Sequence, residues 1–404
     1  MARRRFDARL DQLVTASDVV LVCGAGGVGK TSMAAAVAAT AAVELEAKVL
    51  VVTVDPARRL ATAMGLSAFG NTATRVPDAA LRAVGAEPRG ELWAAMLDTK
   101  ASWDDLIVRH APDAATRAAI LANPLYRNLT ATFTQSHDYI AMERLHELHA
   151  SGRYDLIVVD TPPSRHAIDF LDAPARMAEF FSSRLLRWLI APSRSRLVTL
   201  ASKPFHVVAD RILGATFLAD IAEFFLLFQS MYGGFVDRAK AVEQTLRNPS
   251  TSFIVVTTLE TAPAQEAAVF CEELVRRGFG VGALVFNRVL PAALDDPAAR
   301  RVATTFQRSS DTVAATLLAA ATAGGDGVGA GRGGAASIEP ETLARVLGEV
   351  GQSFLDYATL AAREAELALR LSRKAELTVS VPHLNGDVAG LDDLLELGRA
   401  SWSS

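Results

Sequence analysis

Hydrophobic residues along the chain fall into short β-branched and aliphatic runs, each closed by Gly, Pro, Asp or Asn. Strands that are apolar on both faces are typical of buried parallel sheets covered by helices. The pattern predicts six strands: Val19–Cys23, Val49–Asp55, Leu156–Asp160, Phe253–Thr257, Leu284–Asn287 and Thr378–Val381. Alanine-rich helical stretches lie between them, the clearest being Ser32–Ala47 and Pro263–Arg277. The alternation predicts an α/β fold with a doubly wound, mostly parallel sheet.

Two long stretches interrupt this alternation, and both have helical patterns. Residues 112–150 form the first, and residues 176–246 form the second, which is the most hydrophobic and aromatic part of the chain. In the second stretch, Phe224, Phe225 and Phe228 fall on one side of a helix. We expect two helical insertions, and the aromatic residues of the second are either ordinary core or a surface for a hydrophobic partner.

A glycine-rich segment, residues 323–337, has too few apolar side chains to order itself by burial. We expect it to be a flexible surface loop. The chain has 404 residues, a length that permits one large α/β unit with insertions or two subdomains. We expect a single domain over residues 1–404.

The composition is that of a globular protein, with 50% hydrophobic and 21% charged residues. A formal net charge of −4 gives no overall attraction to nucleic acid, so no nucleic-acid partner is expected. Aspartates at positions 7, 11 and 18 interrupt the basic N-terminal segment, which therefore does not resemble a signal peptide. No stretch of about 18 apolar residues is free of charge, and the expected location is cytoplasmic.

The two cysteines, Cys23 and Cys271, lie in separate apolar elements. Free cysteines in such positions are most often buried and reduced. A zinc or soft-metal site normally needs paired Cys or His residues at close spacing, and the sequence has no such pair. We therefore expect two reduced thiols in the core.

The first strand is followed by Gly24-Ala25-Gly26-Gly27-Val28-Gly29-Lys30-Thr31, which fits the GxxxxGK[ST] phosphate-binding loop, or P-loop. In such a loop, glycines let the backbone N–H groups point at phosphate oxygens, and the N-terminus of the next helix adds a positive dipole. The expected cofactors are ATP and Mg²⁺. Lys30 would reach the β- and γ-phosphates, Thr31 would ligate Mg²⁺, and Ser32 continues the helix start.

The segment GGVGKT resembles the end of the GKGGxGK[ST] motif of the deviant-Walker ATPases, which include ArsA/GET3-type ATPases, ParA and MinD. In that family the lysine second in the motif reaches the phosphates of the other subunit. Alanine stands there in this chain, at Ala25. The resemblance implies a dimer. It also implies that this chain forms either a homodimer lacking the trans lysine or a heterodimer with a paralogue that keeps it.

Two further segments resemble the switches of the ArsA/GET3 branch. Residues 52–60, VTVDPARRL, resemble its TDPA stretch, which implies that Asp55 activates the attacking water; Asp55 is also a suitable helix N-cap. Residues 158–174 resemble the DTAPTGH signature, which implies that Asp160 holds Mg²⁺ through water. His166 matches the histidine of that signature, as a ligand or as a hydrogen-bonding residue of the loop.

The resemblance extends to the adenine end of the site. Asn287 follows a strand in ALVFNRVLP, where the family places the asparagine that reads adenine; the alternative is a simple turn residue. Pro382 and His383, in the last strand, are weaker candidates for packing over the base. Glu260 matches an acidic residue near the dimer seam, or is a solvated loop charge.

Arsenite export is not supported, because the two cysteines are separated and form no thiolate site. The zinc CxxC of the targeting factors is also missing from the sequence. The resemblance implies an ATP-hydrolysing dimer whose closure is coupled to a hydrophobic helix or membrane-protein partner. A nucleotide-gated scaffold with little turnover remains an alternative. A ParA/MinD-like positioning ATPase is another, disfavoured by the long insertions.

Overall fold

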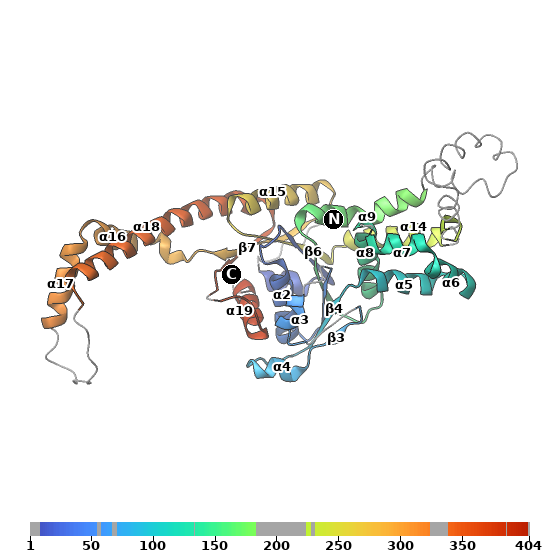
Figure 1. Cartoon of the computed structure of the whole chain (residues 1–404), viewed down its shortest axis with the longest axis horizontal. Helices are drawn as coiled ribbons and strands as arrows, with labels where there is room; N and C mark the ends of the chain where they lie inside the picture. Colours follow the sequence, from blue (N-terminus) through green and yellow to red (C-terminus); the bar gives the residue numbers. More distant parts are fainter. Residues whose placement is uncertain are drawn as a thin grey trace.

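The architecture is built on one eight-stranded sheet with helices on both faces. The computed structural model describes residues 9–54, 58–66, 71–132, 134–182, 224–227, 231–323, 338–384 and 386–402. The strand order is β3-β4-β2-β5-β1-β6-β7-β8, and all neighbours are parallel except β3 and β4 (Figure 1). The predicted doubly wound, mostly parallel α/β fold is confirmed.

The strands are β1 (Val19–Gly24), β2 (Lys48–Thr53), β3 (Thr74–Arg75), β4 (Glu91–Met96), β5 (Leu156–Asp160), β6 (Thr251–Thr257), β7 (Val281–Val289) and β8 (Leu377–Pro382). The helices up to the second insertion are α1 (Leu10–Thr15), α2 (Lys30–Glu44), α3 (Arg58–Ala63), α4 (Asp78–Ala83), α5 (Thr99–His110), α6 (Ala114–Ala122), α7 (Pro124–Thr132), α8 (Thr134–Ala150) and α9 (Ser164–Ser182). The later helices are α14 (Tyr232–Leu246), α15 (Thr261–Arg276), η2 (Ala292–Asp295), α16 (Pro297–Arg308), α17 (Ser310–Ala323), α18 (Pro340–Leu371), η3 (Ser372–Lys374) and α19 (Leu391–Trp402).

Side chains of the central strand β1 alternate between two hydrophobic cores. Val20 and Val22 pack in the core that α2 and α19 cover. Val19, Leu21 and Cys23 pack in the other core, under α8, α9, α14 and α15. Because both faces are covered, every residue of β1 is buried. This double burial explains why the strands are continuous apolar runs in the sequence.

All six predicted strands are present, although several are longer than the sequence indicated. The prediction missed β3 and β4. The strand β4, with the sequence ELWAAM, contains no β-branched residue, and β3 has only two residues. Both lie at one edge of the sheet. Their strand conformation depends on pairing with β2 and on each other, which local propensity does not report.

A helical layer extends the molecule beyond the edge of the sheet at which β3 and β4 lie (Figure 1). It has its own hydrophobic cluster, formed by residues of α5, α6, α7, α8, α9 and α14. Residues 112–150 contain α6, α7 and α8. Most of residues 176–246 lies outside the described residues, including Phe228. Phe224 is described and is 5% exposed in this cluster, so it is a core residue of the chain.

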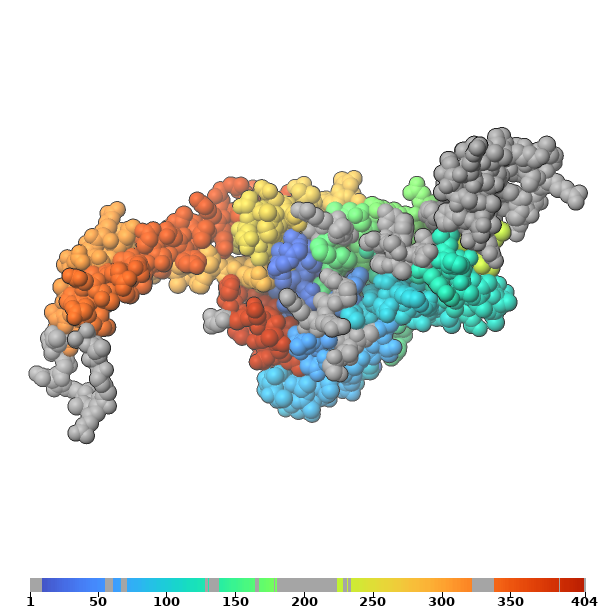
Figure 2. All heavy atoms as spheres, in the orientation of Figure 1, coloured from blue at the N-terminus to red at the C-terminus, as the bar shows by residue number. Residues whose placement is uncertain are grey.

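The helices α16, α17 and α18 form an arm that projects from the sheet on the side opposite the helical layer (Figures 1 and 2). The arm lies between β7 and β8 in the sequence, and α18 has 32 residues. At 1.5 Å per residue, α18 is about 48 Å long. The sequence prediction did not include this arm. Residues 324–337, within the predicted glycine-rich loop, lie outside the described residues.

Both cysteines are free and buried, as predicted. Burial raises the pKa of Cys23 to about 12 and that of Cys271 to about 11. In the described part of the chain, no group of His, Cys, Asp or Glu is arranged to hold a metal ion. None of the helices described there combines the length and the apolar character needed to cross a bilayer.

Candidate nucleotide-binding site

The P-loop connects the carboxyl end of β1 to the first turn of α2 (Figure 1). Gly27 and Gly29 have φ values of 81° and 95°, in the left-handed region that favours glycine. Gly29 is also crowded, because a Cβ atom there would lie 2.4 Å from the side-chain nitrogen of Asn287. Gly26 and Gly27 are exposed, whereas Val28 is buried. The loop therefore presents its backbone at the surface and anchors itself by Val28.

Lys30 is 8% exposed, and its Nζ donates a hydrogen bond to the carbonyl oxygen of Ala25, at 2.8 Å. The lysine side chain thus folds back across the loop that it follows in sequence. The side chain of Ala25 is only 5% exposed and belongs to the hydrophobic core beneath the loop. The position at which the resemblance implies a trans lysine is therefore buried in this chain.

Three polar side chains meet beside the loop. Asp160 closes β5, which lies between β1 and β2 in the sheet. Its Oδ2 accepts hydrogen bonds from the hydroxyl of Thr31, at 2.7 Å, and from that of Thr53, at 3.0 Å. Asp160 is 1% exposed, and Thr53 is fully buried. The P-loop threonine and the strand-end aspartate, predicted separately, are brought together by the fold.

Thr53 was missed in the sequence, although it closes the apolar run of β2 as a single polar residue. Thr161 was missed as well. Its backbone N–H and its hydroxyl both donate to the carbonyl oxygen of Val22, at 3.2 and 3.0 Å. These bonds fix the chain after Asp160 against β1. Their only sequence signal was a hydroxyl residue at a strand end, which is too common to identify a site.

Asn287 lies near the end of β7 and is 6% exposed. Its Nδ2 donates to the carbonyl oxygen of Val28, at 2.8 Å, and its Oδ1 accepts from the N–H of Arg288, at 3.0 Å. The amide nitrogen and oxygen of Asn287, which would read adenine, are thus both hydrogen-bonded to backbone atoms in this structure. Asn287 lies beside the P-loop, and its role in recognising a base stays a prediction.

The remaining predicted residues lie at or just after the carboxyl ends of β6 and β8, or outside the described residues. Pro382 and His383 are exposed at the end of β8, where the N–H of His383 donates to the carbonyl oxygen of Val289. Glu260 is exposed and precedes α15, without a side-chain capping bond. Asp55 lies outside the described residues. His166 lies in α9, and its side chain is likewise not described.

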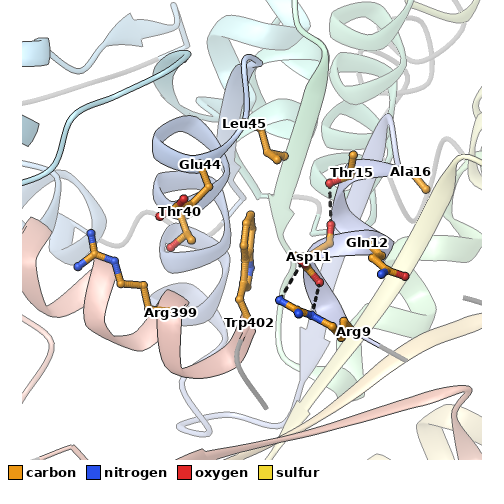
Figure 3. A pocket seen from close by; sticks show the side chains of 10 residues that line it. All are labelled: Arg9, Asp11, Gln12, Thr15, Ala16, Thr40, Glu44, Leu45, Arg399 and Trp402. Carbon is orange, nitrogen blue, oxygen red and sulfur yellow. Dashed lines mark hydrogen bonds and ion pairs between the residues drawn. The ribbon is translucent and has the colours of Figure 1, made fainter. Parts of the chain in front are cut away.

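A pocket of about 760 Å³ lies at the other end of α2 (Figure 3). Trp402 stands in it between α2 and α1, while Arg399 points away along α19. The lining also includes Thr40 and Glu44, from the last turns of α2. Glu44 is 14 residues after Lys30, which corresponds to roughly 20 Å along a helix. This pocket is therefore separate from the phosphate loop.

The geometry fits a nucleotide with its metal. The loop has left-handed glycines, its lysine is held over it, and a threonine hydroxyl faces a buried strand-end carboxylate. Oxygen ligands of this kind suit Mg²⁺, and the N-terminus of α2 suits phosphate. The fold and this loop define the chain as a P-loop nucleotide-binding α/β protein.

Comparison with known proteins gives the family. The model of the anion-transporting ATPase family, ArsA, matches residues 17–311, and the chain belongs to this family. The matched residues include the P-loop, Asp160 and Asn287. The match ends within α17, so α18, β8 and α19 follow it. The family, and the GET3 and arsenical-pump relatives described below, are named as ATPases, which confirms the resemblance to the ArsA/GET3 family.

Three relatives illustrate the relationship. The chain is 30% identical over 283 residues to an uncharacterised protein of Streptomyces coelicolor, covering 69% of this chain and 64% of that protein. It is 23% identical over 307 residues to ATPase GET3 of Kluyveromyces lactis, covering 71% and 77%. It is 24% identical over 283 residues to the putative arsenical pump-driving ATPase 1 of Aquifex aeolicus, covering 68% and 63%. The similarity thus spans less than two thirds of the Streptomyces and Aquifex proteins.

Proposed function

We propose that the chain binds ATP with Mg²⁺ at the P-loop and hydrolyses it. The observation that carries this proposal is the contact between Thr31 and Asp160, 2.7 Å apart beside the buried Lys30. Lys30 would exchange its bond to Ala25 for the β- and γ-phosphates. Thr31 would ligate Mg²⁺, and Asp160 would hold the ion through water. The ion would neutralise charge that develops on the phosphate oxygens.

We propose that Asp55 orients the attacking water, as the resemblance to the TDPA stretch implies. Water would attack the γ-phosphorus while the bond to the β–γ bridging oxygen breaks, giving ADP and phosphate. A carboxylate at this position would hold the water and accept its proton. Asp55 follows β2 in the sequence, and β2 already contributes Thr53 to the site.

The proposed cycle is coupled to the helical layer through α9. This helix begins four residues after Asp160 and packs against α8 and α14. Asp172 of α9 also forms an ion pair with Arg277, just after α15. A movement of the chain after Asp160 would therefore move α9 and the cluster that contains Phe224. We propose that this movement serves a hydrophobic helix or a membrane-protein partner.

Steady-state ATP hydrolysis by the purified chain tests the proposal. Lys30→Ala should abolish tight ATP binding and turnover, because it removes a charge-assisted contact with the phosphates, worth about 1.5–3 kcal/mol or more. Lys48→Ala is the control. It removes the lysine at the start of β2, which forms an ion pair with Glu91 of β4, and it should leave ATP binding and turnover unchanged. Asp55→Asn should bind ATP yet turn over slowly. Equal hydrolysis by wild type and Lys30→Ala would disprove the proposal.

Ala25 favours a second proposal, in which the physiological complex is a heterodimer. The chain cannot supply the trans lysine, so a paralogue that retains it would complete one site and leave the other unequal. Mixing the two purified proteins should then raise ATP turnover above the sum of the separate rates. A chain that turns over at the same rate with and without the paralogue would rule this out. Negligible turnover in every mixture would favour the nucleotide-gated scaffold.

A further inference from the structure

The longest helix of the described chain, α18, carries two different faces. The first is turned toward α16 and α17. Its buried residues Ala344, Gly351 and Ala358 are small and recur every seven positions. A Cβ atom at Gly351 would lie only 2.6 Å from the carbonyl oxygen of Ala303. This face is therefore in close backbone contact with α16 and is fully used within the chain.

The second face, which we call the outer seam, consists of Val346, Val350, Ser353, Tyr357 and Leu360. Their separations are four, three, four and three residues, which is the spacing of core positions in a two-stranded coiled coil. The four apolar members are 45%, 53%, 53% and 46% exposed. Ser353 is exposed as well. The seam lies on the projecting arm, away from the sheet (Figure 2).

One edge of the outer seam carries charges at seven-residue intervals: Glu349, Asp356 and Arg363. Glu349 lies 3.9 Å from Arg345 in an exposed ion pair, a weak interaction. Asp356 accepts a hydrogen bond from Gln352. Arg363 is exposed and forms no ion pair within the described chain. The other edge is apolar, with Leu347, Phe354 and Ala361.

We propose that the outer seam pairs with the outer seam of a second copy of this chain, in antiparallel orientation. A twofold axis midway between Ser353 and Tyr357 places Ser353 of each copy opposite Tyr357 of the other copy. The serine and tyrosine hydroxyls therefore meet at two equivalent places. The same axis places Val350 opposite Leu360. These layers cover the exposed side chains of Val350, Tyr357 and Leu360 from both copies.

The charges select this orientation. With the same twofold axis, Glu349 lies opposite Arg363 of the second copy, and this attraction occurs twice. Asp356 lies near its own counterpart, which is a single repulsion. A parallel pair would instead bring the charged edge against the apolar edge, leaving all three charges without an opposite partner. The antiparallel pair is therefore self-complementary, and a second copy is the occupant that the charge pattern fits.

The proposed pairing of arms involves no residue of the P-loop. It is therefore tested on the full chain carrying Lys30→Ala, without nucleotide, by sedimentation velocity over a range of concentrations. We expect a reversible dimer. Val350→Glu should raise its dissociation constant at least about tenfold, since a charge is buried in the seam. Leu369→Glu is the matched control, because Leu369 is 70% exposed on the same helix but off the seam; it should change nothing.

Charge exchange tests the orientation. Glu349→Arg and Arg363→Glu should each weaken the dimer by about two- to tenfold, and the double exchange should restore it. Asp356→Asn should strengthen it by a similar factor. These responses require complementary pairs between copies, because a purely structural role within one arm would not give restoration by the double exchange.

Cysteine crosslinking provides the geometric test. Val350→Cys and Leu360→Cys are ten residues apart, about 15 Å along one helix, so they cannot join within a chain. A mixture of the two single variants should give a disulfide-linked dimer on oxidation, whereas each variant alone should not. Crosslinking of each variant with itself would show a parallel pair and overturn the proposal. A chain that stays monomeric at every concentration, or a charge exchange that fails to restore the dimer, would overturn it too.

Discussion

The P-loop edge of the sheet and the arm use opposite designs on the same chain. At the P-loop, Lys30, Asp160 and Asn287 are buried polar groups, each held by named hydrogen bonds to neighbouring elements. On the arm, the apolar side chains of the outer seam are exposed along a helix whose small residues are buried on another face. Buried polar groups are costly unless their partners are positioned, whereas exposed apolar groups gain by association.

The difference separates two ways in which a protein prepares for a ligand. The P-loop is held by contacts within the chain itself, through its left-handed glycines and its threonine–aspartate pair. The arm is incomplete as a single chain, and its outer seam needs another surface to be buried. Substitutions in the P-loop should therefore affect nucleotide chemistry, whereas substitutions in the outer seam should affect assembly with another molecule.

The largest expected effect breaks the P-loop. Gly29→Ala places a methyl group 2.4 Å from Asn287 at a φ of 95°. We expect it to destabilise the fold by about 2–4 kcal/mol, the combined cost of left-handed backbone and overpacking. Urea unfolding measures the change. Gly26→Ala has open space and should stay within about 0.5 kcal/mol of wild type; an equal loss in both variants would contradict this account.

A smaller effect is expected on the arm. Gly351→Leu should force α18 away from α16 and destabilise the arm by about 1–3 kcal/mol, because backbone atoms of α16 occupy the space. Hydrogen exchange should rise in α16, α17 and α18, while ATP affinity stays the same. Gly348→Ala is the control, with only Ser310 nearby at 3.9 Å, and it should slow exchange through better helix propensity. A loss of ATP affinity in Gly351→Leu would show that the two regions are coupled.

The smallest expected effect concerns the thiols beneath the site. Burial raises the pKa of Cys23 to about 12 and that of Cys271 to about 11, so both remain protonated at pH 8. The thiolate is the reactive form, so a disulfide reagent should label neither cysteine in the folded chain and both after denaturation. Fast labelling of the native protein would show that the core opens. If Cys23 and Cys271 label slowly, the cysteines introduced on the arm are the reactive thiols in the crosslinking test.

The sequence located the P-loop residues and the end of β5 by local pattern. An apolar run followed by GxxxxGK[ST] is a contiguous signal, so Lys30 and Thr31 were placed on the correct elements. Asp160 followed from the resemblance of residues 158–174 to the DTAPTGH signature and from its place at the end of another apolar run. Pairing of these residues was not contained in either segment, since Thr31 and Asp160 are 129 positions apart. The assignment of Asp55 rests on the resemblance to the TDPA stretch and on its place at the end of the predicted strand Val49–Asp55.

Tertiary structure decided what lies beside what. Thr53 joins the site only because β2 is the neighbour of β5, and β4 becomes a strand only by pairing with β2. The strand pattern could not reveal the arm, because the arm consists of helices. Both faces of α18 have helical spacing, and they differ only in what packs against them. Local sequence thus determined the phosphate loop and the α/β class. Contacts between distant segments decided which polar groups are buried together and which apolar helix face is left to meet another molecule.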